Sequence, residues 1–201
     1  MAGPDYEILK RETAFQGHFR VDRYRLRFRL HDGGMSRAIT RELLERGHAV
    51  AVLPYDPARD AVVLLEQFRI GALEAPGRPW CLEPVAGIID EGETLEQVAR
   101  RESREEAGLE LTALIRMHDY LSSPGGTSER VTLYLGRVDA ANAGGLHGLA
   151  HEAEDIRSFV LGFDQAFAEM TSRPIAVASL LIAMQWLALN RARVRREWAG
   201  R

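Results

Sequence analysis

The sequence predicts an α+β fold, and three observations carry that prediction. Residues 24–30 alternate strictly between apolar side chains and Arg, which is the period of a half-buried strand. Two continuous apolar runs, 49–53 and 61–65, flank a turn-rich connector, as in a hairpin of buried strands. Residues 94–108 carry helix capping signals. Because strands and helices interleave without regular βαβ units, α+β is favoured over a doubly wound parallel sheet.

The N-terminal segment is predicted to be a small antiparallel sheet over residues 6–45. After the alternating stretch, residues 31–34 (His-Asp-Gly-Gly) indicate a turn, and residues 41–44 continue as a second strand or a short helix. We therefore place one region at residues 1–47, which we expect to form a dimer, and a second domain at residues 48–201.

The second domain begins with the predicted hairpin and contains the main helices. Thr94 and Gln97 form a capping box, and Gly108 ends the helix where a left-handed residue is needed. The other expected elements are a loop at 71–80, a strand at 82–87, a Gly-rich loop at 122–129, a strand at 131–138, a long loop at 140–155, a strand at 156–163, a short helix at 164–170 and a long helix at 174–198. The basic C-terminal end of that last helix suits the helix dipole.

Composition excludes several classes of protein. The chain has 201 residues, 46% of them hydrophobic, so it has enough apolar material for a sizeable core. No run of about 18 apolar residues suggests a membrane span. The formal net charge of −3 argues against a general nucleic-acid binder. The N-terminus shows no secretory signal, and Cys81 alone forms neither an intrachain disulfide nor a multi-cysteine zinc site, so we expect a cytoplasmic enzyme.

Lys10 is the only lysine among 26 basic residues. A P-loop requires a Lys after its Gly-rich turn, so that class of phosphate site is excluded. Any contact with phosphate is therefore expected to come from an Arg guanidinium.

The predicted helix at 94–108 carries carboxylates where its buried face should be apolar. Steps of three and four residues along the inward stripe give Leu95, Val98, Glu102, Glu105 and Leu109. Glu106 lies one turn beyond Glu102 on the same side. Like charges this close repel, and a divalent cation is the simple way to stabilise them. Carboxylate ligands without Cys or His indicate a hard ion such as Mg²⁺ or Mn²⁺.

A solvated acidic helix face is the alternative interpretation, and by charge alone it would be preferred. The spacing of residues over the longer segment 87–109 favours the metal site instead. The pattern is Gly87, five residues, Glu93, seven residues, Arg101-Glu102, two residues, Glu105-Glu106, one residue, and Gly108-Leu109. This pattern resembles the Nudix box, the motif of hydrolases that cleave a nucleoside diphosphate linked to another moiety. One position departs, because Ser103 stands where the family usually has an aliphatic residue.

The resemblance implies the Nudix fold, with mixed β-sheets sandwiched between helices, and a set of metal ligands. Glu102, Glu106 and the backbone carbonyl of Ala86 would hold two or three Mg²⁺ ions, with Mn²⁺ as the alternative, and Glu154 would approach the same cluster. Glu105 would be a further ligand, and Arg101 would hold a carboxylate in place. Gly87 would let the strand turn sharply before the helix.

Further stretches resemble the bacterial ADP-ribose pyrophosphatase subfamily, and their order along the chain matters more than any one of them. They are residues 45–49, 65–69, 79–83, 122–129 and 148–157. In this subfamily the N-terminal sheet crosses to a partner subunit and helps form each active site.

The same resemblance assigns substrate contacts and a proton acceptor. The implied substrate-binding residues are Phe19, Arg41, Glu42, Arg46, Arg69, Ile88, Ser123, Pro124, Gly125 and Glu129. Either His18 or Phe19 would stack on the adenine. Glu152 would be the proton acceptor, on a loop that substrate orders.

The sequence thus predicts hydrolysis of ADP-ribose to AMP and ribose 5-phosphate by a homodimer. A different Nudix substrate, such as an NDP-sugar, NADH or a dinucleoside polyphosphate, is the nearest competing hypothesis. A Nudix-fold ligand sensor without catalysis is a second hypothesis, and a purely structural dimer module is a third.

Overall fold

The computed structural model describes residues 4–149 and 153–199 and divides the chain into two compact units. Unit 1 comprises Met1–His48 and Leu121–Arg130. Unit 2 comprises Ala49–Tyr120 and Val131–Arg201. The N-terminal region therefore includes the Gly-rich loop near residue 125, whereas the sequence predicts this loop in the second domain.

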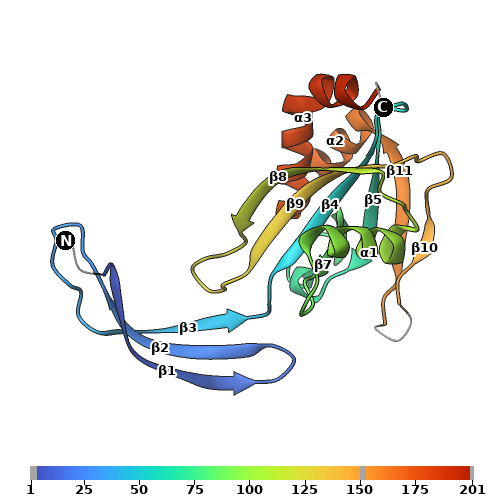
Figure 1. Ribbon diagram of the computed structural model, residues 1–201. Helices are drawn as coiled ribbons and strands as arrows, with labels where there is room; N and C mark the ends of the chain where they lie inside the picture. The colour runs from blue at the N-terminus through green and yellow to red at the C-terminus, as the bar shows by residue number, and fades with distance from the viewer. Residues whose placement is uncertain (1–3, 150–152, 200–201) are drawn as a thin grey trace. The chain divides into compact units, whose positions relative to one another are not determined.

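Unit 1 is built on a three-stranded antiparallel sheet. Its strands are β1 (Tyr6–Gln16), β2 (Arg20–Phe28) and β3 (Ile39–Glu45), in the order β1-β2-β3 (Figure 1). Residues 41–44, for which the sequence allows a strand or a helix, form a strand in which Arg41 lies opposite Tyr24 and Glu42 opposite Arg23. Glu42 accepts a hydrogen bond from Arg23 Nη2 at 2.8 Å, a cross-strand pair that favours this register.

One buried carboxylate organises the sheet of unit 1. Asp22 is 1% exposed and accepts hydrogen bonds from Arg11 Nη2 at 2.6 Å and Thr13 Oγ1 at 3.1 Å. The hydrogen bond from Arg11 holds the pKa of Asp22 below its usual value. Apolar side chains of β1 are nevertheless largely exposed, with Tyr6 at 62% and Phe15 at 60%. The sheet therefore has little apolar core of its own.

Unit 2 contains a mixed eight-stranded sheet. The main order is β10-β11-β5-β4-β9-β8, and β6 and β7 pair with β5 and β4. The strands are β4 (Ala49–Asp56), β5 (Ala61–Phe68), β6 (Trp80–Glu83), β7 (Val85–Ile88), β8 (Ala113–Leu121), β9 (Arg130–Arg137), β10 (Gly145–His147) and β11 (Ile156–Gly162). β4 and β5 are antiparallel, as the predicted hairpin requires, whereas β4 and β9 are parallel.

Helices cover both faces of this sheet (Figure 1). The sheet has a hydrophobic core on each face, and alternate residues of β4 contribute to one or the other. Val50 and Val52 pack in the cluster that contains Val98 of α1 (Leu95–Ala107). Leu53 and Tyr55 pack in the cluster that contains α2 (Phe163–Ser172) and α3 (Ala178–Ala199). The short 3-10 helix η1 (Ile70–Ala72) follows β5. The predicted α+β architecture, with sheets sandwiched between helices and an N-terminal antiparallel sheet, is confirmed.

The predicted ends of α1 are confirmed. The Thr94 hydroxyl accepts from the Gln97 N–H at 3.3 Å, and the Gln97 side chain accepts from the Thr94 N–H at 2.8 Å. Gly108 has a φ of 64°, the left-handed conformation expected after the helix. The last helix begins later than predicted, at Ala178, and Pro174 lies before it.

Three strands differ from the sequence analysis. The strand expected at 82–87 is two strands, because Pro84 lacks the N–H that a continuous ladder needs. β8 was not predicted, and β10 lies within the region expected to be a long loop at 140–155. None of the helices in the described part of the chain combines the length and apolar character of a membrane span.

Candidate active site

The innermost carboxylate of α1 belongs to Glu106. This residue is 4% exposed, and its Oε2 accepts a hydrogen bond from the Ala86 N–H of β7 at 2.9 Å. Burial raises the pKa of Glu106 to about 8, against the lowering effect of the Ala86 N–H. The charged form of this buried carboxyl group therefore needs a positively charged partner.

Glu102 lies against the backbone of the same strand. A Cβ on Gly87 would be 1.6 Å from Glu102 Oε1, so only glycine leaves room for this carboxylate. Gly87 remains within β7 and pairs with Val50, which corrects the predicted role in a sharp turn. Burial raises the pKa of Glu102 to about 7, and the guanidinium of Arg101 opposes this shift.

Arg101 is the centre of an ion-pair network at the outer side of this cluster. Its Nε and Nη2 each donate at 2.9 Å to the two carboxylate oxygens of Glu93. Its Nη1 donates to Glu102 Oε1 at 2.7 Å and to Glu105 Oε2 at 3.1 Å. The hydrogen bond to Glu93 is the main cause of the raised pKa of Arg101. Glu93 therefore positions Arg101, and Arg101 in turn supplies the counter-charge for two predicted metal ligands.

The departure at Ser103 is accommodated inside the core. Ser103 is fully buried, and its hydroxyl donates to the Ala99 carbonyl one turn earlier at 2.8 Å. Because the hydroxyl is satisfied within α1, a small polar residue fits here without leaving an unpaired group.

The loop before β11 brings one more carboxylate toward the cluster. Glu154 Oε2 accepts from the Leu149 N–H at 3.0 Å, and its charge contributes to the raised pKa of both Glu102 and Glu106. Glu152, the predicted proton acceptor, lies outside the described residues. Among residues 4–149 and 153–199, no three acidic, His or Cys side chains are already arranged as a metal-ligand group.

These residues fit a divalent cation by their chemistry. The donors are carboxylate oxygens, which suit a hard divalent ion. Burial disfavours the charged form of two of these carboxyl groups, Glu102 and Glu106, and a bound cation would offset that cost. Arg101 already donates to Glu102 Oε1, so this carboxylate would be shared between Arg101 and a bound cation. Glu102, Glu106, Glu154 and the Ala86 backbone are the groups that would hold the ion.

Arg69 is held at the end of β5 by a carboxylate that the sequence analysis did not select. Glu83 of β6 accepts from Arg69 Nη2 at 2.8 Å and from Arg69 Nε at 3.0 Å. Gln67 Nε2 donates to the same oxygen of Glu83 at 3.1 Å. Glu83 is 7% exposed, and an acidic residue at the end of the otherwise apolar run 80–83 was the available signal in the sequence.

Ile88, another predicted substrate contact, ends β7 and is 40% exposed. Its carbonyl accepts from Arg101 Nη2 at 3.4 Å. Arg69, Ile88 and the carboxylate cluster thus all belong to unit 2.

The remaining predicted substrate residues belong to unit 1. Arg41, Glu42, Pro124 and Gly125 line one groove of about 500 Å³, together with apolar side chains of β1 and β2. The Ser123 carbonyl accepts from the Gly126 N–H at 3.0 Å, which forms the tight turn that exposes this backbone.

Phe19, Arg46 and Glu129 form a second group in unit 1. Arg46 Nε lies 3.4 Å from Glu129 Oε1, and its guanidinium is 5.6 Å from the centre of the Phe19 ring. His18 and Phe19 have ring centres 4.6 Å apart, so both aromatic candidates for adenine stacking lie together. The predicted site residues are therefore divided into one set on each unit.

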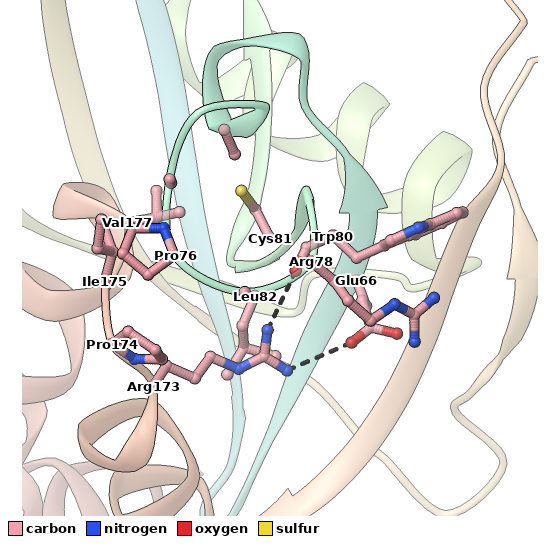
Figure 2. A pocket seen from close by; sticks show the side chains of 13 residues that line it. Glu66, Pro76, Arg78, Trp80, Cys81, Leu82, Arg173, Pro174, Ile175 and Val177 are labelled. Carbon is pink, nitrogen blue, oxygen red and sulfur yellow. Dashed lines mark hydrogen bonds and ion pairs between the residues drawn. The ribbon is translucent and has the colours of Figure 1, made fainter.

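A separate pocket of about 320 Å³ in unit 2 contains none of the predicted site residues among the residues that line it. Figure 2 shows the Arg173 guanidinium extending toward both Glu66 and the backbone at Trp80. Its Nη2 donates to Glu66 Oε1 at 3.3 Å and its Nη1 to the Trp80 carbonyl at 3.1 Å. These bonds fasten the segment after α2 to the sheet, and we assign the pocket no part in the site.

Comparison with known proteins identifies related sequences. The family model of the NUDIX domain matches residues 45–180. The chain is 50% identical over 195 residues to the ADP-ribose pyrophosphatase of Escherichia coli strain K12, covering 97% of this chain and 93% of that protein. It is 44% identical over 197 residues to the ADP-ribose pyrophosphatase of Haemophilus influenzae, covering 96% and 91%.

A solved structure supports the fold independently. The crystal structure of an ADP compounds hydrolase superposes with a TM-score of 0.68 at 20% identity, covering 92% of this chain and 95% of that one. At that identity the likeness concerns the fold alone. The family match and the two relatives, taken with the carboxylate cluster on α1, show that the chain belongs to the NUDIX family of hydrolases.

Proposed function

We propose that this chain hydrolyses the diphosphate of ADP-ribose, giving AMP and ribose 5-phosphate, with Mg²⁺ as the divalent cation. The observation that carries the proposal is the pair of buried carboxylates, Glu102 and Glu106, packed on the β7 backbone. The names of the relatives at 44% and 50% identity supply the substrate. The lone Cys81 and a nucleotide substrate favour a cytoplasmic location.

Each residue then has a chemical task. A divalent cation, when bound, neutralises the diphosphate and lowers the pKa of the attacking water. Arg69 stabilises the charge that develops on the phosphate oxygens, and Arg101 keeps Glu102 and Glu105 in position. Glu152 accepts the proton of the attacking water.

Product analysis tests this function directly. With ADP-ribose and Mg²⁺ we expect AMP and ribose 5-phosphate in equal amounts, and chelation with EDTA should abolish their formation because the carboxylates then lack their ion. Chromatography of the products, with Mn²⁺ in parallel, is the measurement. A wild-type chain that releases no AMP with any divalent metal would contradict the proposal, as would an NDP-sugar, NADH or a dinucleoside polyphosphate with a higher kcat/KM.

We also propose that the active form is a homodimer in which unit 1 of one copy completes the site on unit 2 of the other. The division of the predicted residues between the units supports this, as does the exposed apolar surface of β1. Unit 1 contributes the groove lined by Arg41 and Glu42 and the group formed by Phe19, Arg46 and Glu129. Unit 2 contributes the carboxylates of α1 and Arg69.

Mixing two inactive variants tests the shared site. Glu106→Gln alters only unit 2, and the double variant Arg41→Ala, Arg46→Ala alters only unit 1. Co-expressed with different tags, the two chains should recover roughly a quarter of wild-type activity, because half of randomly formed dimers are mixed and each has one intact site. Each variant expressed alone is the control. No recovery in an isolated mixed dimer would show that each site is built from a single chain.

A further inference from the structure

We propose that Glu83 is a positioning residue for the proposed reaction, which aims the guanidinium of Arg69 at the diphosphate, and that Gln67 fixes Glu83 in turn. The inference rests on the proposed function, because it requires Arg69 to contact the substrate.

The geometry of Arg69 supports this role. Glu83 receives hydrogen bonds from Nε and Nη2, which together form one edge of the guanidinium. Within the described residues no hydrogen bond engages Nη1, so the end of the fork is free to bind an anion. The Arg69 side chain is 45% exposed, whereas that of Glu83 is 9% exposed. The immobile partner is therefore the carboxylate, and the arginine reaches outward from it.

The two strands place Gln67, Glu83 and Arg69 in a row. Leu65 of β5 lies opposite Glu83 of β6, and Gln67 lies opposite Cys81. Gln67 is 6% exposed, and its amide donates to Glu83 at 3.1 Å. The row lies on the face of the sheet that α1 covers, because Leu65 packs in the cluster that contains Val98. The carboxylates of α1 are on that face as well.

Holding Arg69 in place before the substrate binds reduces the entropy cost of binding. A free Arg side chain loses rotamer entropy when it is fixed. A guanidinium already clamped on one edge loses less of it when the substrate arrives. Arg69 also lies within electrostatic range of Glu106, one of the carboxylates of α1.

Glu83→Gln tests the role, because it keeps the side-chain shape and removes the charge. We expect kcat/KM for ADP-ribose to fall about 10- to 100-fold, mainly through kcat, because an undirected guanidinium no longer meets the developing charge. In an Arg69→Ala background the same change should alter kcat/KM less than about twofold, because Glu83 acts only through Arg69. Gln67→Leu should give a smaller loss, also absent in the Arg69→Ala background.

The matched control is Glu66→Gln. Glu66 is the neighbouring carboxylate of β5, and it pairs with Arg157 at 2.9 Å and with Arg173 at 3.3 Å. Its variant removes the same charge from an arginine pair on the neighbouring strand β5 and should leave kcat/KM unchanged. Thermal unfolding checks that every variant is folded, and Gln67→Leu retains the test if Glu83→Gln is not.

The outcomes separate the two proposals. If the wild type releases AMP but the losses from Glu83→Gln and Arg69→Ala multiply independently, Glu83 is only structural and the inference is overturned. The same follows if Glu66→Gln and Glu83→Gln reduce kcat/KM equally. If the wild type itself releases no AMP, the proposed function fails, and the role of Glu83 in that reaction is overturned with it.

Discussion

Glu106→Gln is expected to lower kcat for ADP-ribose about 10³-fold or more, a barrier increase of about 4 kcal/mol. Glu106 is the most deeply buried carboxylate of the cluster, and the substitution keeps its shape while removing the charge that would hold a divalent cation. Steady-state kinetics at saturating Mg²⁺ measure the effect. Glu110→Gln, which changes an exposed carboxylate paired with Arg104 just beyond α1, is the matched control and should be fully active.

Without metal, the same variant should be more stable than the wild type, although it is less active. The folded protein holds a proton on Glu106 up to a pH of about 8, whereas an ordinary Glu releases it near 4.5. The folded state therefore binds more protons than the unfolded state between these values, and the free energy of unfolding of the metal-free wild type falls as pH rises through this window. Burial raises the pKa of Glu102 to about 7, which adds to the same trend.

Glu106→Gln removes the larger part of this dependence. At pH 8 in EDTA the variant should be more stable than the wild type by about 1–3 kcal/mol, a difference that shrinks toward pH 5. Denaturant unfolding at several pH values measures it. A variant that keeps activity within tenfold of the wild type, or that is less stable than the wild type in EDTA at pH 8, would contradict the assignment of Glu106.

Gly87→Ala is the second substitution expected to have a large effect. The added methyl group would lie 1.6 Å from Glu102 Oε1 and 2.5 Å from its Cγ, so the whole Glu102 side chain must leave its place. We expect kcat to fall about 10²-fold or more, because a ligand displaced by an ångström no longer serves the site. Overpacking of this kind also costs about 1–3 kcal/mol of stability.

Gly71→Ala is the control for this prediction. Gly71 also lies in unit 2, and an added Cβ would meet nothing within 4 Å. Kinetics and thermal unfolding of both variants give the comparison, and the decisive ratio is kcat of Gly87→Ala to kcat of Gly71→Ala. Full activity of Gly87→Ala would show that Glu102 does not need its place against β7.

The interior of the fold could be predicted from the sequence, but the two edges of the large sheet could not. Residues 49–53 and 61–65 are apolar throughout because β4 and β5 lie in the middle of the sheet with helices on both faces. β8 and β10 are the outermost strands in the main strand order, and both were missed. Each has a neighbour on one side only, so Arg116 and His118 remain exposed and break the apolar pattern.

The site was predictable where chemistry depends on spacing along one helix. Three-residue and four-residue steps bring Glu102, Glu105 and Glu106 near one another because helical geometry is local, but of the three only Glu106 is buried, and Glu105 was wrongly placed on the inward stripe. The contact between Gly87 and Glu102 and the clamp of Glu83 on Arg69 join different elements. Such contacts depend on how strands pair, and sequence periodicity along one segment does not contain that information.

The guanidinium of Arg101 has a consequence for how the enzyme responds to its ionic surroundings. Because Arg101 already balances Glu102 and Glu105, these carboxylates have a counterion within the protein itself. A divalent cation held by these carboxylates would share them with Arg101, so we expect its affinity to be lower than carboxylates without such a partner would give. The fraction of enzyme with Mg²⁺ bound should therefore depend on the free Mg²⁺ concentration. Hydrolysis should slow when nucleotides in solution bind the ion and lower that concentration.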